Sequence, residues 1–489
     1  MRRRQVLGAA LGGFVPFNPF GAAWASDVAA VTLSGGATTL TQADIADFAK
    51  GLKGPVLLQV NEGYDSARAI WNAMFDRRPA LIARCTDTAD VVRAVQFARG
   101  HDLLMSVRGG GHNIAGLAVC DGGLMLDLSL MRGATVDTAR RTARVAGGAL
   151  LADLDEAAQA VGLVTTAGVV SHTGAGGLTL GGGIGRLQRT LGLTIDNLLG
   201  VEIVTADGRV VRANAEENAD LHWGVRGGGG NFGVVTAFVY QLHPFDGKMV
   251  NFSFAYEFAK AKSILTNYFD YAASAPDAVH IGASVFSDRG GERGVSVSGC
   301  LYATPEQRET QLAKIRKIGV PGRERVEDVN YVQLQKSGDA ASRFGQYHYS
   351  KAGFFGEITP AVTDSLLGFF NENPMPGGRA GLLAMGGAVG RVAPDATAFP
   401  NRKGSHNIDV GGATTDKGEA EKFVTWGRNY WKAIVEHTAG GGFYVNQMVE
   451  EGDRRIRDNF GGNYERLSAL KRKYDPINLF RLNANVKPA

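Results

Sequence analysis

Cysteine is scarce in this sequence of 489 residues, and Cys85, Cys120 and Cys300 show no Cys-x-x-Cys spacing. That pattern argues against a disulfide framework and against a structural zinc site, and it allows one disulfide at most. We therefore expect no metal centre. Excess charge is also missing, because 52 basic residues stand against 48 acidic ones and no run of five like charges occurs. Nucleic acid is accordingly a poor candidate partner.

Several catalytic and membrane signatures are absent. No Walker A pattern, G-x-S-x-G or H-E-x-x-H occurs, which argues against phosphoryl transfer, ester hydrolysis and zinc-dependent hydrolysis. The stretch Gly228–Gly233 matches the dinucleotide fingerprint G-x-G-x-x-G, which must follow a strand and open a helix. Here a β-branched run, 234–239, follows it, so the required context is missing. Beyond the N-terminal segment no stretch reaches the ~18 apolar residues of a membrane span, and we expect a soluble mature product.

Glycine, by contrast, is abundant, with 67 residues, well above the usual share of about 7%. The predicted strand 103–107 leads into Arg108-Gly109-Gly110-Gly111-His112-Asn113, where glycines let the backbone approach a ligand and offer amides to an anionic group. His112 supplies a nucleophilic imidazole directly behind them. A plain loop is the alternative interpretation of this stretch. Further clusters at 176–177, 181–185 and 227–230 favour one ligand wrapped by several loops.

The N-terminus has the layout of a signal peptide. Arg3-Arg4-Gln5-Val6-Leu7 resembles the twin-arginine pattern, an apolar run extends to Phe20, and Ala23-Trp24-Ala25 offers a cleavage site. The twin-arginine (Tat) machinery exports folded proteins, so we expect residues 1–25 to be removed and the product to be periplasmic or secreted. A disordered basic tail is the alternative.

The first half of the chain reads as mixed strands and helices. We expect a capped helix beginning near Thr41, and a helix from Thr88 that Gly100 closes as its C-terminal cap. The alternation over 124–129 predicts a half-buried strand, and 149–160 a helix. Residues 201–205 and 210–212 should pair as a hairpin.

From Met249 onward the pattern changes to an antiparallel sheet. Phe252, Phe254, Tyr256 and Phe258 alternate on one face, and strands 279–285 and 295–301 flank a turn. Thr304-Pro305-Glu306-Gln307 opens a helix with a capping box and proline at its first position. Strands followed by helices over 246–445 indicate a separate α+β domain. The last fifty residues should be helical to Tyr474 and extended from Asp475.

These blocks together resemble the FAD-linked oxidases of the vanillyl-alcohol-oxidase type, with a PCMH-type FAD-binding domain, and among them the berberine-bridge-enzyme-like branch. The resemblance covers roughly residues 60–489 and rests on ordered motifs: Arg77–Cys85, Arg108–His112, Gly176–Gly185, Thr194–Leu199 with Val204–Gly208, Arg226–Gly233, and Asn463 to Asn485. It implies an α+β flavoprotein of two domains. The FAD-binding domain, with two α+β subdomains, would take 61–245 and 446–489, the substrate domain would be the insertion 246–445, and 26–60 would be an extension.

The resemblance also implies a covalent flavin. The histidine matching His112 is bonded to the C8 methyl group of FAD, whose pyrophosphate is held by main-chain amides. Val170 stands where bicovalent relatives have a cysteine, so a single link is expected, with His172 as a hydrogen-bonding residue near the flavin ring. The residues expected to bind FAD are Arg108, Gly109, Gly110, Gly111, His112, Asn113, Thr173, Gly174, Gly176, Gly177, Gly181, Gly182, Gly183, Gly185, Asp196, Val204, Asn483 and Asn485.

On the substrate side, hydride transfer to a flavin requires a base for the substrate proton. Tyr444-Val445-Asn446 resembles the family's Tyr-x-Asn signature, which implies Tyr444 as base with Asn446 beside it, in surroundings that lower the tyrosine pKa. A tyrosine in a protein core is the alternative interpretation. Asp409 is the second candidate base, in a segment where Asn401 replaces the family's histidine and His406 stands where tyrosine is frequent. The roles of His406, Asn407 and Asp409 stay open at this point.

The sequence therefore predicts an FAD-dependent oxidoreductase that takes hydride from an alcohol, amine or carbohydrate-type substrate, with molecular oxygen as acceptor and hydrogen peroxide as product. A dehydrogenase of the same fold that passes electrons to a quinone or a protein is one alternative. A catalytically inactive binding protein is another, although the glycines and His112 are all retained.

Overall fold

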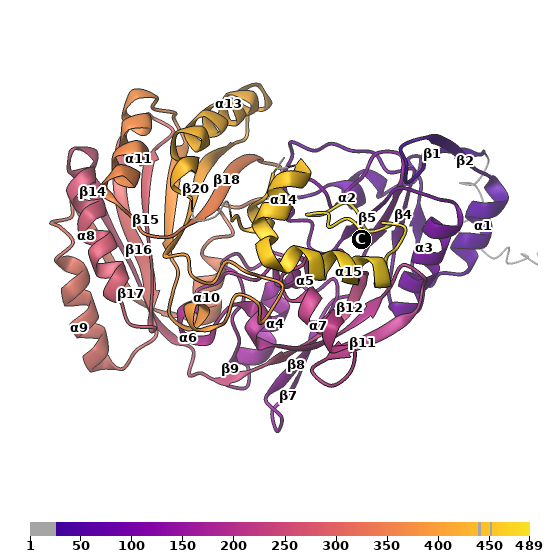
Figure 1. The fold of residues 1–489 in the computed structure, drawn as a ribbon, viewed down its shortest axis with the longest axis horizontal. Helices are drawn as coiled ribbons and strands as arrows, with labels where there is room; N and C mark the ends of the chain where they lie inside the picture. The colour runs from indigo at the N-terminus through magenta and orange to yellow at the C-terminus, as the bar shows by residue number, and fades with distance from the viewer. Residues whose placement is uncertain (1–25, 439–441, 450–451) are drawn as a thin grey trace, which may run out of the picture.

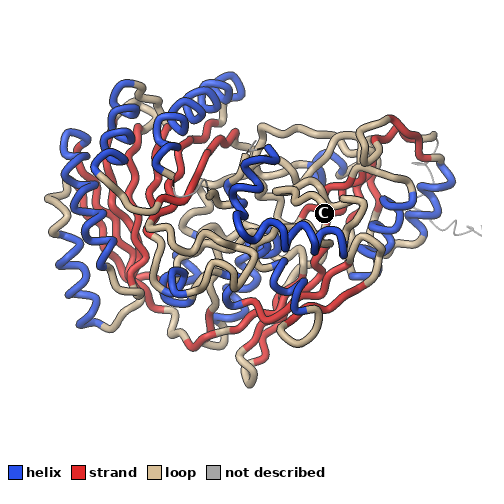
Figure 2. Tube along the Cα trace, in the orientation of Figure 1, coloured by secondary structure: helices blue, strands red, loops and turns tan. Residues whose placement is uncertain are grey.

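A computed structural model describes residues 26–438, 442–449 and 452–489, and the predicted signal peptide lies outside these ranges. Two halves lie side by side in Figure 1, one built on a large antiparallel sheet and the other on two smaller sheets. Figure 2 shows long loops running between them. The expected α+β architecture is confirmed.

The large sheet has seven antiparallel strands in the order β17-β14-β16-β15-β19-β20-β18. Their bounds are β14 Lys248–Glu257, β15 Val279–Ser287, β16 Arg293–Leu301, β17 Arg323–Asn330, β18 Tyr347–Phe355, β19 Gly378–Ala384 and β20 His406–Thr414. Four helices cover its outer face: α8 Ala261–Ser274, α9 Pro305–Arg316, α11 Pro360–Glu372 and α13 Lys417–Ile434. The other face is turned toward the second half of the molecule.

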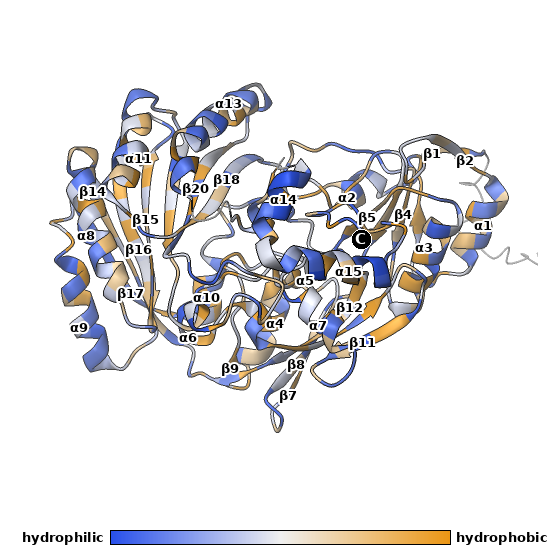
Figure 3. Cartoon of the chain, viewed as in Figure 1, coloured by the Kyte–Doolittle hydropathy of each residue, from blue (hydrophilic) through white to orange (hydrophobic). Residues whose placement is uncertain are grey.

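Alternation along the strands explains the core of this half. Phe252, Phe254 and Tyr256 project from β14 into the cluster shared with the covering helices, as predicted. Phe258 does not continue the strand, because it begins the short 3-10 helix η2, Phe258–Lys260, and is only partly buried. Figure 3 shows that helix α9, on the outside of this half, is largely hydrophilic. The predicted capping box at Thr304, with Pro305 at the first helical position, is confirmed.

A five-stranded antiparallel sheet of order β11-β10-β12-β8-β7 lies in the other half. Its strands are β7 Ala134–Asp137, β8 Thr142–Ala146, β10 Leu198–Val204, β11 Val210–Asn214 and β12 Val234–Gln241. The predicted hairpin is confirmed by the pairing of β10 with β11. Residues 234–239, which follow the G-x-G-x-x-G match, lie in strand β12. The helix that a dinucleotide-binding fingerprint requires is therefore missing there, as predicted.

A third sheet carries the loop to the first glycine cluster. Its order is β3-β4-β6-β5, with β3 Val56–Leu57, β4 Leu81–Arg84, β5 Met105–Arg108 and β6 Leu124–Asp127. Strand β6 pairs in parallel with both β4 and β5 and is buried along its whole length. The prediction of a half-buried strand is therefore wrong, because a central parallel strand is covered on both faces.

Helix ends in this half follow the predicted caps with one exception. Helix α1, Gln42–Lys50, begins at Thr41, which forms a capping box with Asp44. Helix α3, Thr88–Gly100, ends at His101 as C-cap, and the left-handed residue is Asp102 with φ 51°. Gly100 is thus the last helical residue and not the cap. Since aspartate tolerates the left-handed region, the turn does not require glycine.

The remaining elements connect the sheets. They are β1 Val28–Val31, β2 Ala37–Leu40, α2 Tyr64–Arg68, α4 Leu151–Gln159, β9 Leu163–Val164, α5 Ala175–Leu180, α6 Gln188–Leu191, η1 Thr194–Asn197, α7 Ala219–Val225, β13 His243–Pro244, α10 Tyr331–Lys336, α12 Ala388–Arg391, η3 Val435–His437, η4 Val445–Gln447, α14 Gly452–Phe460, η5 Gly461–Asn463 and α15 Tyr464–Tyr474. No helix in the described ranges is long and apolar enough to cross a membrane.

The C-terminal segment returns to the glycine-rich half. The buried ammonium of Lys471, on α15, donates hydrogen bonds to the Asn231 carbonyl at 2.8 Å and to the Asp475 carboxylate at 2.7 Å. The side chain of Asn231 in turn bonds the main chain of Ala484 and Val486. The C-terminal segment thus packs against Asn231, directly after the glycine cluster 227–230.

Candidate active site

A cavity of about 1010 Å³ lies between the large sheet and the glycine loops. Its size is at the upper end of the range of small-molecule sites, ~300–1,000 Å³. The lining comes from both halves: glycine loops on one side, and strands β18, β19 and β20 on the other. A cavity of this size can hold a large ligand together with a smaller ligand in contact with it.

The first glycine cluster presents unpaired amides to this cavity. Gly109, Gly110, Gly111, His112 and Asn113 all line it, and none of their main-chain N–H groups donates to another described residue. These amides are therefore available to hydrogen-bond an acceptor on a ligand. The backbone is folded tightly here. Gly111 has φ 71°, and a Cβ on Gly110 would lie 2.3 Å from the Gly174 nitrogen.

His112 follows this loop as a half-buried imidazole whose lowered pKa keeps it neutral. Its Nε2 lies 2.7 Å from Nδ1 of His172, which comes from a loop 60 residues later. Burial lowers the pKa of His112 to about 3, assisted by the nearby His172 and His348. The ring also stacks against Trp71, with centroids 5.0 Å apart. An uncharged imidazole with one nitrogen held by a partner leaves the other nitrogen free as a nucleophile.

The later glycine clusters leave room in the same cavity. Gly177 and Gly229 line it, and no protein atom would block a Cβ at Gly177, while the nearest atom to one at Gly229 is 3.9 Å away. Thr173, Gly174, Gly176, Gly181 and Asn483, all predicted from the sequence, also belong to the lining. These glycine surfaces lack side chains, so a flat or extended ligand can lie against the main chain.

Tyr444, immediately before η4, also lines the cavity. Its hydroxyl oxygen accepts hydrogen bonds from the amides of Gly183 at 3.2 Å and Ile184 at 3.1 Å, and from Asn446 Nδ2 at 2.9 Å. The Asn446 amide also donates to the Leu178 carbonyl at 2.9 Å, which fixes its orientation. Burial raises the pKa of Tyr444, although these three donors act in the opposite direction. The expectation of a lowered tyrosine pKa is therefore wrong for these protein surroundings, because desolvation outweighs the hydrogen bonds.

Strand β20 shows which side chains of residues 406–409 face the cavity. Asn407 and Asp409 face the cavity, whereas His406 points to the other side of the sheet, against Tyr268 and Phe269. Burial lowers the pKa of His406 to about 3. The carboxylate of Asp409 forms an ion pair with Arg379 on β19, with a nitrogen to oxygen distance of 2.9 Å. The two-residue period of a strand thus places Asp409, and not His406, at the site.

Comparison with known proteins decides the family. A family of FAD-binding domains matches residues 79–214, and a family described as berberine and berberine like matches 444–487. The chain is 33% identical over 449 residues to an FAD-linked oxidoreductase of Dictyostelium discoideum, covering 91% of this chain and 97% of that one. It is 32% identical to (R)-6-hydroxynicotine oxidase of Paenarthrobacter nicotinovorans, covering 89% and 97%.

The chain belongs to the berberine-bridge-enzyme-like FAD-linked oxidoreductases. A solved structure of this fold, that of glucooligosaccharide oxidase from Acremonium strictum with its 6-S-cysteinyl, 8α-N1-histidyl FAD, superposes with a TM-score of 0.82 at 23% identity. It covers 91% of this chain and 99% of that one. In this oxidoreductase the residues present fit FAD, because the free amides from Gly109 to Asn113 suit a diphosphate and the glycine surfaces leave space for a flat ring.

Some residues expected to bind FAD lie outside the cavity lining. They are Arg108, Gly182, Gly183, Gly185, Asp196, Val204 and Asn485. Arg108 donates to the Ala67 carbonyl at 2.6 Å. A Cβ on Gly185 would meet the Ala167 carbonyl at 1.6 Å, so this glycine permits loop packing. The Gly183 amide donates a hydrogen bond to the Tyr444 hydroxyl, so Gly183 acts on the site through that tyrosine.

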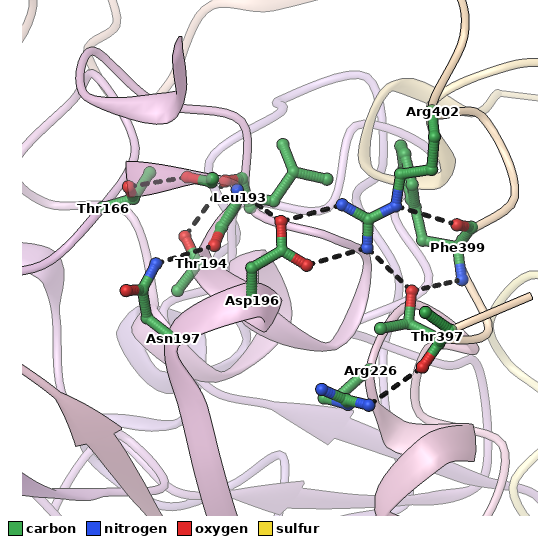
Figure 4. Close-up of polar contacts among 12 residues, drawn as sticks. Thr166, Leu193, Thr194, Asp196, Asn197, Arg226, Thr397, Phe399 and Arg402 are labelled. Atoms are coloured by element: carbon green, nitrogen blue, oxygen red, sulfur yellow. Dashed lines mark hydrogen bonds and ion pairs between the residues drawn. The ribbon is translucent and has the colours of Figure 1, made fainter. Parts of the chain in front are cut away.

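Asp196, one of the residues outside the cavity lining, has a structural role. Both of its carboxylate oxygens accept hydrogen bonds from Arg402 at 2.8 Å, and Leu193 N donates to the same carboxylate at 2.8 Å (Figure 4). The guanidinium of Arg402 is fully buried and also bonds Thr397. Asp196 therefore joins η1 to the segment before β20.

Sequence reasoning missed other lining residues of the oxidoreductase. Gly229 and Gly230 lie in a cluster noted for its glycines, so that cluster was the available signal. Trp71, His348 and Arg379 come from segments with no motif. Trp71 stacks on His348 with centroids 3.8 Å apart, and only the fold brings the two together. Within the described ranges no group of three His, Cys, Asp or Glu could hold a metal ion.

Proposed function

We propose that this FAD-linked oxidoreductase takes hydride from an alcohol, amine or carbohydrate hemiacetal, and that molecular oxygen accepts the electrons with release of hydrogen peroxide. One observation carries the proposal: a loop of unpaired amides leads directly into a neutral imidazole, in a cavity shared with Tyr444 and Asp409. When bound, FAD supplies the hydride acceptor. The relatives named for nicotine and glucooligosaccharide oxidation support small substrates of this kind.

His112 is the residue proposed to tether the flavin through its C8 methyl group. The pairing of Nε2 with His172 points to Nδ1 as the bonding atom, and the low pKa keeps the ring neutral. Val170 lines the cavity without a thiol, which supports a single link. Of the histidyl and cysteinyl links named for the Acremonium strictum oxidase, only the histidyl one has a residue to form it here.

Tyr444 is proposed as the acceptor of the substrate proton. The phenolate form would be stabilised by the three N–H donors that its oxygen already receives. Asp409 is less suited, because its carboxylate is engaged by Arg379. The Tyr444 hydroxyl also holds the loop at Gly183 and Ile184, so the same side chain positions a glycine loop and lines the cavity.

The direct test is a two-stage assay of purified holoprotein. Alcohols, sugars and alkaloid-type amines are first screened without oxygen for bleaching of the flavin absorbance. Oxygen is then admitted to the reduced protein. Equimolar hydrogen peroxide and rapid return of the absorbance are expected. If the flavin stays reduced in air and returns only with a quinone or protein acceptor, the enzyme is a dehydrogenase. Protein purified without flavin would contradict both forms of the proposal.

We also propose export by the twin-arginine route, from Arg3-Arg4 and the site after Ala25. Since that route carries folded proteins, the flavin would be loaded before export. N-terminal sequencing of the exported protein should begin at Ser26. Export that is unchanged in an Arg3→Lys, Arg4→Lys double variant would contradict the proposal.

A further inference from the structure

Most of the charged side chains that line the cavity are positive. Among the described lining residues, only Arg289, Arg343, Arg379 and Asp409 carry ionic side chains. The lining histidines do not change this balance, because burial lowers the pKa of His112 to about 3 and of His348 to about 4. The wall is therefore net positive near neutral pH.

Two of the three arginines lie in the large sheet or in one of its turns, and the third lies on the loop before β18. Arg289 lies in the turn between β15 and β16, and Gly377 N donates to the Ser287 carbonyl at 2.9 Å, which holds this turn beside the start of β19. Arg379 is the second residue of β19. Arg343 lies just before β18. The loop that carries Arg343 lies beside the proposed flavin tether, because the next residue, Phe344, packs against the His112 ring with centroids 5.5 Å apart.

Two of the three guanidinium groups have no anionic partner in the described protein. Arg379 pairs with Asp409, but Arg289 forms no hydrogen bond or ion pair with a described residue. Arg343 makes one side-chain hydrogen bond, from Nε to the Ala340 carbonyl at 3.0 Å. The neighbouring carboxylate of Asp288 accepts from Glu292 N within its own turn. Positive charge is thus left for a ligand.

We propose that the substrate is an organic acid whose carboxylate is held by Arg289 and Arg343, with Arg379 adding to the field. Guanidinium groups bind carboxylates through paired, charge-assisted hydrogen bonds. A cleft lined by one sign of charge also raises the local concentration of the opposite ion and speeds its arrival. This inference rests on the proposed oxidase function and specifies its substrate class.

The test uses matched substrates that differ only in charge. Glucuronate, glucuronamide and glucose share the anomeric hydroxyl, while mandelate and mandelamide share a secondary alcohol. The acid of at least one set should bleach the flavin, or perturb its absorbance on binding, ~10-fold or more efficiently than its amide. Raising the ionic strength from ~20 to ~300 mM should reduce that advantage several-fold, as charges become screened.

Arg289→Gln and Arg343→Gln should each weaken the response to the acid ~10-fold and leave the response to the amide unchanged. Arg316→Gln is the matched control, because Arg316, the last residue of α9, pairs with Glu324 and neither residue lines the cavity. Flavin content and spectrum are measured in every variant. If the neutral compounds react equally well or better, or the acids show no response, the inference is overturned. Peroxide formation from a neutral substrate would in that case leave the oxidase function standing.

Discussion

Removal of the His112 imidazole separates cofactor binding from cofactor attachment. In wild-type protein the flavin should stay with the polypeptide after acid precipitation, because the bond through the imidazole survives unfolding. His112→Ala should release all of its flavin under acid, while the amides from Gly109 to Asn113 still bind it in the native protein. Absorbance of the supernatant and the pellet measures this directly. Retention in the variant would instead implicate His172, which lies 2.7 Å from His112.

Tyr444→Phe tests the proposed base at the same scale. Loss of a positioned base should slow flavin reduction ~10²–10⁴-fold at saturating substrate. The expected stability loss is ~1–3 kcal/mol, because the amides of Gly183 and Ile184 lose their acceptor. Since the tyrosine pKa is raised, the wild-type reduction rate should climb with pH, and the variant should lose that dependence.

Stopped-flow reduction across pH, with a compound that bleaches the flavin, gives the result. Asp409→Asn serves as the comparison. If Tyr444→Phe keeps the wild-type rate and pH profile while Asp409→Asn does not, the carboxylate is the base.

At the scale of elements, the contact of α4 with α10 contains a buried carboxylate that should make stability depend on pH. Asp155 on α4 accepts a hydrogen bond from Gln335 Nε2 at 3.2 Å, and burial raises its pKa to about 7. A carboxyl whose pKa is higher in the folded state favours folding when protonated. That advantage disappears as the pH rises from about 4 through 7, because the folded protein must then ionise the group.

Asp155→Asn mimics the protonated form and should therefore be more stable than wild type at pH 8, with a difference that shrinks toward pH 5. Thermal unfolding of the holoprotein at several pH values measures this. Asp153→Asn on the same helix is a suitable comparison, because the pKa of Asp153 is lowered and its carboxylate pairs with Arg132. An identical Tm difference at every pH would contradict the assignment to Asp155.

At the scale of the whole molecule, the Asp196–Arg402 pair holds the long segment between β19 and β20 against η1. Arg402→Met leaves the Asp196 carboxylate largely buried without its partner, and removal of one member of a buried pair costs ~3–5 kcal/mol. The double variant Asp196→Asn, Arg402→Met should recover part of that loss, since no unpaired charge remains. Urea unfolding of holoprotein for the complete cycle gives the coupling. Additive losses would show that the pair does not act as a unit.

The sequence by itself determined the local elements and the chemistry of the first loop. Thr41 and Thr304 cap the helices that they were predicted to begin, and β10 pairs with β11 as the predicted hairpin. The residues Gly109–His112 place main-chain amides and an imidazole in one cavity. These features depend on neighbours within a few residues, so the chain order encodes them directly. The motifs also sufficed to identify the family.

Only the tertiary structure decided which side chains meet. The burial of β6, the pairing of His112 with His172, the ion pair of Asp196 with Arg402 and the raised pKa of Tyr444 each depend on contacts across long stretches of chain. A motif fixes a residue's type but not its dielectric surroundings or its partner. The free energy of burying a polar group is set by whatever the fold packs around it, and that information is spread over the whole sequence.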